Sequence, residues 1–327
     1  MNSGAMWLIR RAGFYGLAAW VALTLNFFIP RWMPGDPATV MFARLQGELD
    51  AEAINALRET FGLSDAPLHI QYWTYLQHMF RGDMGVSVAY YPAPVGDVIA
   101  TGLLWTVVLA GTALVIAFAL GTTLGALGAW NRGGILDTVL HPTLAFIGAF
   151  PYFWLAMVAA HYLAFTLGWF PLRHAYDPAL DPGLNWAFIS SAVHHAALPG
   201  ATLVIASLGG WSLTMRNTLI GVLGDEHVRF ADARGLPPSM VFWYAIRTAM
   251  LPNLTGFGMA LGFVLSGALL TEIVFSYPGQ GYLLIQAVRA QDYPLMQGIF
   301  LTITLAVLIA NLAVDTVSIA VDPRVGE

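Results

Sequence analysis

The polar side chains that stand inside long apolar stretches are this chain's first candidates for chemistry. Glu272 lies near one end of such a stretch, and Arg216 and Asn217 lie near the end of another. An unpaired ionisable group is costly to bury in a membrane, so all three are possible pore or gate residues. The alternatives are an interfacial cap or ion pair for Glu272. For Arg216 they are a charged end that reaches the interface or bridges to the polar loop that follows.

Enzymatic chemistry has little support in this sequence. His174, His194 and His195 could offer imidazoles to a metal ion, but their spacing matches no zinc motif, and H-E-x-x-H is missing. Cysteine is absent, which excludes thiol chemistry, and all 14 Lys or Arg residues are Arg, which excludes the lysine of a Walker A loop. We therefore expect no catalytic residue, no metal site and no cofactor bound by this chain.

The composition indicates an integral membrane protein. Hydrophobic residues make up 57% of the 327 positions, charged residues 10%, and the mean hydropathy is +0.66. The apolar runs approach or exceed the ~20 residues that a helix needs to cross a bilayer, and they lack the short alternation of a β-barrel. We predict an all-α polytopic protein with six transmembrane helices, near residues 12–29, 100–130, 135–170, 198–223, 247–275 and 295–321.

The arginines predict the orientation. An N-terminus in the cytoplasm places most arginines of the short loops and flanks on that side, and it leaves the opposite side rich in Asp and Glu. Six spans then bring both termini into the cytoplasm. The first apolar run continues without a small-residue cleavage site, so it is predicted to be an uncleaved span and not a signal peptide. The net charge of -5, without a basic cluster, argues against nucleic acid as a partner.

Residues 224–247 form a polar insertion in the apolar second half. The stretch predicts two short helices broken at Gly235, which can take the left-handed conformation that ends a helix, with Pro237 or Pro238 in the next first turn. Ala231 and Ala233 give the first helix a small-residue face. The pattern favours a docking elbow, and an ordinary amphipathic loop helix is the alternative.

A second polar segment, residues 34–98, is long enough for a small helical insertion outside the membrane. Its first half predicts a helix that ends at Gly62, and its second half a helix with an aromatic-rich face. That face is assigned to Ile70, Trp73, Tyr75 and Leu76. After it, Gly85 at positive φ and an Asx-type turn closed by Asp83 are expected to return the chain to the membrane.

Two further patterns concern the membrane helices themselves. Gly121, Gly125 and Gly128 place small residues on one helical face, which favours close helix packing in a bilayer. Pro142 and Pro151 interrupt the third predicted span, where they kink the helix and free backbone carbonyls that can line a cavity.

Several of these stretches resemble the dipeptide/oligopeptide family of ABC importer permeases, whose coupling loop runs D-Y-V-R-T-A-R-A-K-G and then H-A-L-R-N-A-L-L-P. Here the two pieces are E-H-V-R-F-A-D-A-R-G and Y-A-I-R-T-A-M-L-P, one residue closer together and without basic residues directly after the glycine. The family's P-G-D-P, G-D-x-G-x-S and F-x-x-P-G-x-G patterns recur at 34–37, 82–87 and 275–281. The resemblance covers nearly the whole chain.

The resemblance implies a type I ABC importer permease fold in a bacterial or archaeal inner membrane. Residues 1–33 would be the cytoplasmic N-terminus and first helix, 34–98 the extracytoplasmic insertion, and 99–327 a five-helix core with coupling loop 224–247. The implied partners are a second permease subunit, two cytoplasmic ATPases that bind ATP and Mg, an extracytoplasmic solute-binding protein and membrane lipid. The residues implied in ATPase coupling are Glu226, Arg229, Ala231, Ala233, Arg234, Gly235 and Leu236.

The substrate stays open at this stage. Members of the family import dipeptides, oligopeptides, nickel complexes or β-linked oligosaccharides, and the resemblance favours oligopeptides or oligosaccharides. The alternative function is a proton- or ion-coupled secondary transporter, which would be expected to show an internal repeat and acids near the bilayer midplane. Neither feature is evident in the sequence.

Overall fold

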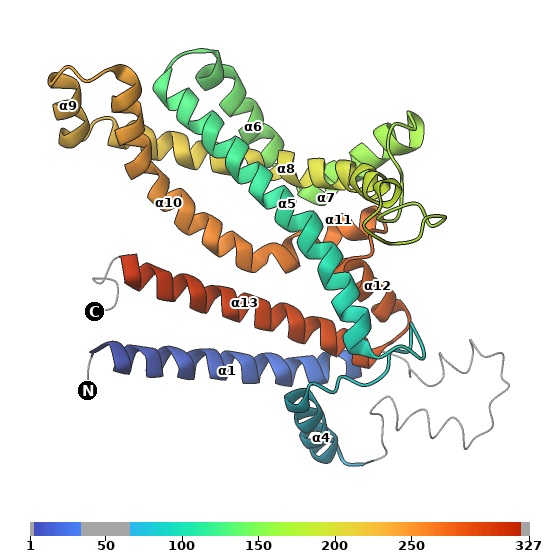
Figure 1. The fold of residues 1–327 in the computed structure, drawn as a ribbon. Helices are drawn as coiled ribbons and strands as arrows, with labels where there is room; N and C mark the ends of the chain where they lie inside the picture. Colours follow the sequence, from blue (N-terminus) through green and yellow to red (C-terminus); the bar gives the residue numbers. More distant parts are fainter. Residues whose placement is uncertain (1–2, 34–65, 322–327) are drawn as a thin grey trace. The chain divides into compact units, whose positions relative to one another are not determined.

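The computed structural model describes residues 3–33 and 66–321, and this part of the chain is built of helices (Figure 1). In chain order they are α1 (Ser3–Arg31), α4 (Leu68–Arg81), α5 (Val95–Trp130), the π-helical turn η1 (Leu136–Leu140), α6 (His141–Gly148), α7 (Tyr152–Ala159), the π-helical turn η2 (Ala160–Thr166), α8 (Trp186–Val222), α9 (Glu226–Ala233), α10 (Pro238–Gly267), α11 (Leu269–Val274), α12 (Gln280–Arg289) and α13 (Tyr293–Val321). The chain forms two compact units. One comprises residues 1–106 and 278–327, and the other residues 107–277.

The first unit pairs the two ends of the chain. Helix α13 lies along α1, and α4 packs against the end of α1 (Figure 1). The predicted P-G-D-P turn and the helix before Gly62 lie outside the described residues. The predicted segment boundaries at 33/34 and 98/99 stay a prediction. The packing of α13 on α1 joins the two ends of the chain in one unit.

The predicted second helix of the insertion is present as α4, but its buried face is different from the expected one. Tyr75 and Leu76 are buried against Phe27, whereas Ile70 and Trp73 are 48% and 63% exposed. At 100° per residue, the packed positions 72, 75, 76 and 79 share one face of the helix, whereas position 70 lies opposite the centre of that face and position 73 lies beyond its edge. The assignment of all four to one face was therefore wrong, and Tyr72 and Met79 complete the packed side.

The turn after α4 has the predicted geometry. Gly82 and Gly85 have φ of 74° and 77°, and the backbone N–H of Gly85 donates to the Asp83 carboxylate at 3.1 Å. The chain then forms a short hairpin, in which the N–H of Val95 donates to the carbonyl of Gly85. The Asx-type turn is thus confirmed.

Asp292 fastens this hairpin to the turn before α13. Its fully buried carboxyl accepts hydrogen bonds from the Ser87 hydroxyl, from the Ala89 N–H at 2.9 Å and from the Leu295 N–H at 3.0 Å. Burial raises the pKa of Asp292, and these donors oppose the rise. The motif at 82–87, which carried part of the family resemblance, is therefore in direct contact with the turn before α13.

The second unit is organised around α8, which contacts α6, α7 and α10. The predicted glycine face of α5 is its contact surface with α8 and α6. A Cβ at Gly121 would lie 2.6 Å from the Trp211 Cβ, one at Gly125 would overlap the Ser212 carbonyl, and one at Gly128 would overlap the His141 ring. The expectation of close helix packing along this face is confirmed.

The third predicted span is broken. Stretches 136–148 and 152–166 meet at an angle of 94°, and Pro151 stands at the break with extended backbone angles. Four described stretches are long and apolar enough to cross a membrane, 10–31, 95–130, 186–222 and 293–312, and the bent pair would make a fifth. Helix α10 is not among them, so the count of six within the whole chain stays a prediction.

Candidate functional site

The elbow between α9 and α10 is closed by a Schellman motif. The N–H of Leu236 donates to the Ala231 carbonyl, and the N–H of Gly235 donates to the Asp232 carbonyl at 2.9 Å. Gly235 supplies the left-handed residue that this motif requires, with φ of 75°. Pro237 follows with extended angles and Pro238 begins α10. The predicted break at Gly235 is confirmed, and the hydrogen bonds give the elbow a fixed geometry.

The inner side of the elbow is part of a hydrophobic core. Val228 and Ala231 are 2% and 8% exposed, and Leu236 is half-buried beside them. Their cluster also takes residues from the ends of α5, α8 and α10, namely Ala126, Ala129, Met215, Leu219, Val222, Val241, Ala245 and Ala249. Because α9 shares this core with three long helices, a displacement of α9 must shift their ends as well or open voids among well-packed side chains.

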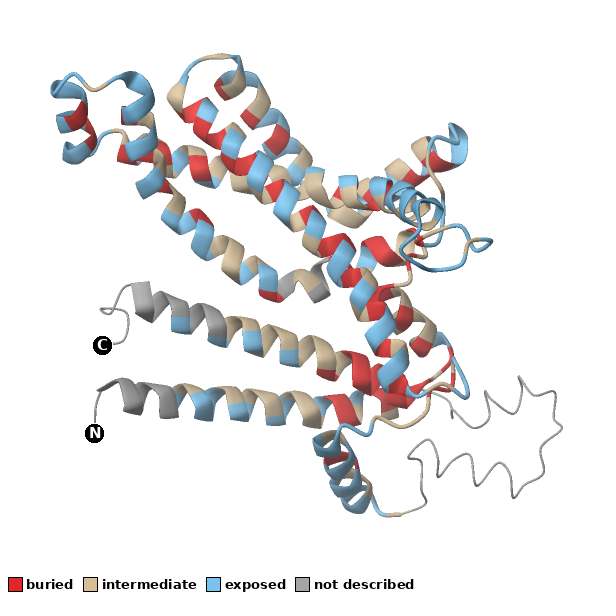
Figure 2. Cartoon of the chain, in the orientation of Figure 1, coloured by how far each residue is buried: buried red, intermediate tan, exposed pale blue. Residues whose placement is uncertain are grey.

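The outer side of the elbow faces away from this core (Figure 2). Five of the residues implied in ATPase coupling are exposed there, Glu226, Arg229, Ala233, Arg234 and Gly235. The exposed ring of Phe230 lies below the Arg234 guanidinium, 5.7 Å from its carbon. Trp243 and Tyr244, on the first turns of α10, are 69% and 54% exposed. The elbow therefore presents charges and aromatic rings together.

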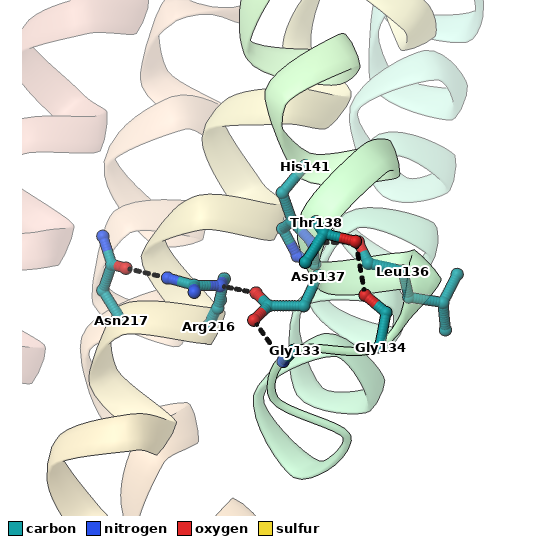
Figure 3. Close-up of polar contacts among 8 residues, drawn as sticks. All are labelled: Gly133, Gly134, Leu136, Asp137, Thr138, His141, Arg216 and Asn217. Carbon is teal, nitrogen blue, oxygen red and sulfur yellow. Dashed lines mark hydrogen bonds and ion pairs between the residues drawn. The ribbon is translucent and has the colours of Figure 1, made fainter.

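Arg216 makes the principal polar contact of the second unit (Figure 3). Its Nε donates to a carboxylate oxygen of Asp137, whose other oxygen accepts the Gly133 N–H at 2.8 Å. A guanidinium nitrogen of Arg216 also donates to the Asn217 side chain at 3.2 Å. Asn217 thus shares the polar cluster of Arg216. These contacts of Arg216 lead to the turn between α5 and α6 and not to the polar loop after α8.

Asp137 was not among the sequence candidates, although a signal for it existed. It is the acid in the first turn of the third predicted span, at the same membrane face as Arg216. An arginine near the end of a membrane helix calls for a partner at that depth. The Asp137 side chain is 7% exposed, and His141 lies in the next turn, with Nδ1 2.6 Å from the Leu136 carbonyl oxygen.

Glu272 does not belong to this cluster. It lies on α11, at the end of the unit away from the elbow (Figure 1), and its side chain is fully buried. The Tyr277 N–H donates to its carbonyl at 2.8 Å. Burial raises the pKa of the Tyr277 phenol, and the nearby Glu272 charge adds to the rise. The structure thus separates Glu272 from Arg216 and Asn217, which the sequence had grouped as gate candidates.

His194 and His195, two of the candidate imidazoles for a metal ion, have hydrogen-bond partners nearby. The ring nitrogens of His194 and His195 lie 3.2 Å from the Trp169 carbonyl oxygen and 2.8 Å from the Ser191 carbonyl oxygen. Among residues 3–33 and 66–321, no group of three potential metal-ligating side chains is close enough to hold an ion.

The chain matches two models of one family of membrane components. A model described as "Binding-protein-dependent transport system inner membrane component" covers residues 121–327. The model for the N-terminal part of such components covers residues 5–103. Together they span the elbow, the Asp137 turn and the hairpin at Ser87.

Similar proteins extend over nearly the full length. The probable D,D-dipeptide transport system permease protein DdpB of Escherichia coli (strain K12) is 32% identical over 98% of both chains. The di/tripeptide transport system permease protein DppB of Pseudomonas aeruginosa is 33% identical over 97% of this chain and 98% of its own. The glutathione transport system permease protein GsiC of Salmonella paratyphi A is 33% identical over 93% and 94%.

Proposed function

Since this chain belongs to the family of binding-protein-dependent transport system inner membrane components, as its motifs predicted, we propose that it is one permease subunit of an ATP-driven importer of short peptides. Its relatives are permease proteins, and the chain is a non-catalytic component. The energy would come from two cytoplasmic ATPases, and a similar second permease subunit would complete the path. A solute-binding protein would deliver the peptide from outside.

The observation that carries this proposal is the construction of the elbow. Its outer residues are exposed, whereas Val228 and Ala231 are held in a core with the ends of α5, α8 and α10. A partner that docks on the outer side and moves would therefore shift the cytoplasmic ends of three membrane helices together. Such a coupled displacement is what alternating access requires.

The ion pair of Arg216 with Asp137 supports the same role. It ties α8, which leads directly into the elbow, to η1, the π-helical turn that begins the third predicted span. The tie lies close to the elbow core, because Met215 and Leu219 on either side of Arg216 belong to that core. We assign Arg216 and Asp137 to force transmission. Glu272 is left as a possible gate residue on the other part of the unit.

Peptides are the favoured substrate class because relatives are named for dipeptides, di- and tripeptides, and glutathione, which is itself a tripeptide. No comparable support exists for the oligosaccharide alternative. The orientation proposed here follows the arginine distribution, with both termini and the elbow in the cytoplasm.

Reconstitution into liposomes tests the proposal. Uptake of a panel of di- to tetrapeptides and β-linked oligosaccharides is measured with the binding protein, the partner permease and the ATPases. We expect peptide uptake that requires ATP and every component. Omission of the ATPases or of the partner permease should abolish it.

Two outcomes would overturn the proposal. If oligosaccharides are taken up and peptides are not, the proposed substrate class is wrong. If this chain alone takes up solute under an imposed proton gradient, the protein is a secondary transporter and not a subunit of an ATP-driven importer.

A further inference from the structure

A cavity of about 630 Å³ lies in the second unit, at the break of the third span. Gly148, Phe150 and Tyr152 line it from the break, and Ala206 and Ser207 line it from α8. Its volume is within the range of about 300 to 1,000 Å³ that small-molecule sites occupy. The α8 residues that line it are near the middle of a 37-residue helix, so the cavity lies far from both ends of that span.

The break leaves carbonyl groups at the edge of this cavity. In a continuous helix the Phe150 carbonyl would accept the Trp154 N–H, but that N–H donates to the Pro151 carbonyl at 2.9 Å. Pro151 itself has no N–H to offer to the preceding turn. The Ser207 hydroxyl donates to the Leu203 carbonyl at 2.7 Å, which leaves its oxygen as an acceptor. Apart from the Tyr152 hydroxyl, which can donate or accept, the polar groups at the break and on Ser207 are therefore acceptors.

The remaining wall is apolar and includes Ala113, Leu114, Ala206, Val264 and Ala268. None of the described lining residues carries a charge. A ligand suited to this site offers an N–H group to the carbonyls and an apolar side chain to the wall. A carboxylate would lose its hydration here without gaining a donor from a charged side chain, which is unfavourable. A peptide's middle residue has both required features.

We propose that this cavity is a peptide subsite within the subunit, which binds a backbone N–H group at the break between α6 and α7 and an apolar side chain against α5, α8 and α10. The inference rests on the proposed import of peptides. It also rests on a general constraint, because irregular backbone at membrane depth is tolerated where it is buried or lines a cavity, and broken helices form substrate sites in other transporters.

Photolabelling of the complete complex tests the site. The probe is the tripeptide Ala-photoleucine-Ala, added with the binding protein and ATP and then irradiated, and adducts are mapped by mass spectrometry. We expect adducts within 148–152 and 203–207, reduced by an excess of Ala-Leu-Ala. Uptake of the probe with adducts confined to other segments would refute the subsite and leave peptide import intact. Absence of any peptide uptake by the wild-type complex would instead refute the proposed function.

A pair of substitutions provides a second test. Ala206→Phe fills the cavity, whereas Ala119→Phe places the same ring at an exposed position of α5. We expect Ala206→Phe to lower uptake of Ala-Leu-Ala relative to Ala-Ala-Ala by about tenfold, the discrimination that one misplaced apolar group gives. Ala119→Phe should leave that ratio unchanged. An equal loss for both peptides in Ala206→Phe would show a structural defect and contradict the subsite.

Discussion

Arg216 and Asp137, which are 79 positions apart in the chain, form an ion pair between α8 and the turn that precedes α6. The carboxylate is nearly buried, at 7% exposure, and its second oxygen is held by the Gly133 N–H. Asp137 belongs to η1, between α5 and α6, and Arg216 belongs to α8, which leads into α9. The pair therefore fixes the distance between η1 and the end of α8, at the membrane face where the elbow lies.

Breaking this pair should destabilise the second unit and weaken coupling. Arg216→Ala leaves the Asp137 charge nearly buried with one backbone donor, which costs roughly 1 to 3 kcal/mol. We expect a lower melting temperature of the purified complex and a smaller peptide-stimulated ATPase rate. Arg216→Lys is the matched control, since it keeps the charge but not the guanidinium geometry. It should lower the melting temperature and the ATPase rate less than Arg216→Ala does. Equal losses in both variants would show that charge alone contributes little.

The elbow requires glycine at position 235 because of the backbone conformation there, and not because a side chain would lack space. No atom lies within 4 Å of a Cβ built there, but φ is 75°. Gly235→Val should cost about 1 to 3 kcal/mol, because a β-branched residue resists the left-handed region. Gly235→Asn, which tolerates that region, should retain most activity. We expect normal membrane levels for both variants and loss of peptide-stimulated ATPase activity in Gly235→Val only. Equal activity of the two would contradict the coupling role.

Two glycines of α5 allow a matched test of helix packing. A Cβ at Gly125 would overlap the Ser212 carbonyl and lie 2.9 Å from the Met215 Cβ, whereas one at Gly111 meets nothing within 4 Å. Gly125→Ala should destabilise the unit by about 1 to 3 kcal/mol through overpacking. Gly111→Ala should be neutral or stabilising by up to about 1 kcal/mol, because alanine favours helix. Melting temperatures of the two purified variants check this, and a reversed order would exclude α5 packing on α8 through this face.

The sequence was most informative where a local rule decides the structure. The left-handed Gly235, the Asx turn of Asp83 and the glycine face of α5 each follow from short-range geometry or residue size, and the structure contains them. Hydrophobicity also located the long helices, although it did not determine the 94° bend at Pro151.

Pairings between distant segments could not be predicted in the same way. Neither the contact of Asp137 with Arg216 nor that of Ser87 with Asp292 has a periodic signal, because each depends on how whole helices pack. The buried face of α4 was misassigned for a related reason. Its aromatic residues are distributed around the helix, and only contact with Phe27 selects one side.

The stability of the hairpin that follows α4 should depend on Asp292. Asp292→Asn replaces one acceptor oxygen by an NH₂ group that faces donors such as the Ser87 hydroxyl and the Ala89 N–H, at a cost of roughly 1 to 3 kcal/mol. Ser87→Ala removes one donor to Asp292 and leaves two backbone donors in place. Its cost in stability should therefore be near the lower limit of that range. Melting temperatures of the purified complexes give the comparison. A larger effect of Ser87→Ala would contradict the arrangement.

The same carboxyl predicts a pH dependence. Its pKa in the folded chain is raised above the ordinary value of 3.8, because it is buried. The folded state therefore binds the proton more readily, and the stability contributed by this group is complete below the ordinary pKa and is lost as the pH rises through the folded pKa. We expect the melting temperature of the wild type to exceed that of Asp292→Asn by an amount that becomes smaller as the pH rises above about 4. A widening difference would show a lowered pKa.

Cysteine labelling can decide the orientation of the chain, because the wild-type sequence contains no cysteine. Thr74 is exposed on α4 and Ser239 is exposed at the start of α10. The arginine distribution places α4 outside and the elbow inside. We therefore expect Thr74→Cys to react with a membrane-impermeant maleimide in intact spheroplasts, and Ser239→Cys to react only after lysis. The reverse pattern would place the elbow outside, where no ATPase could reach it, and would refute the coupling role together with the topology.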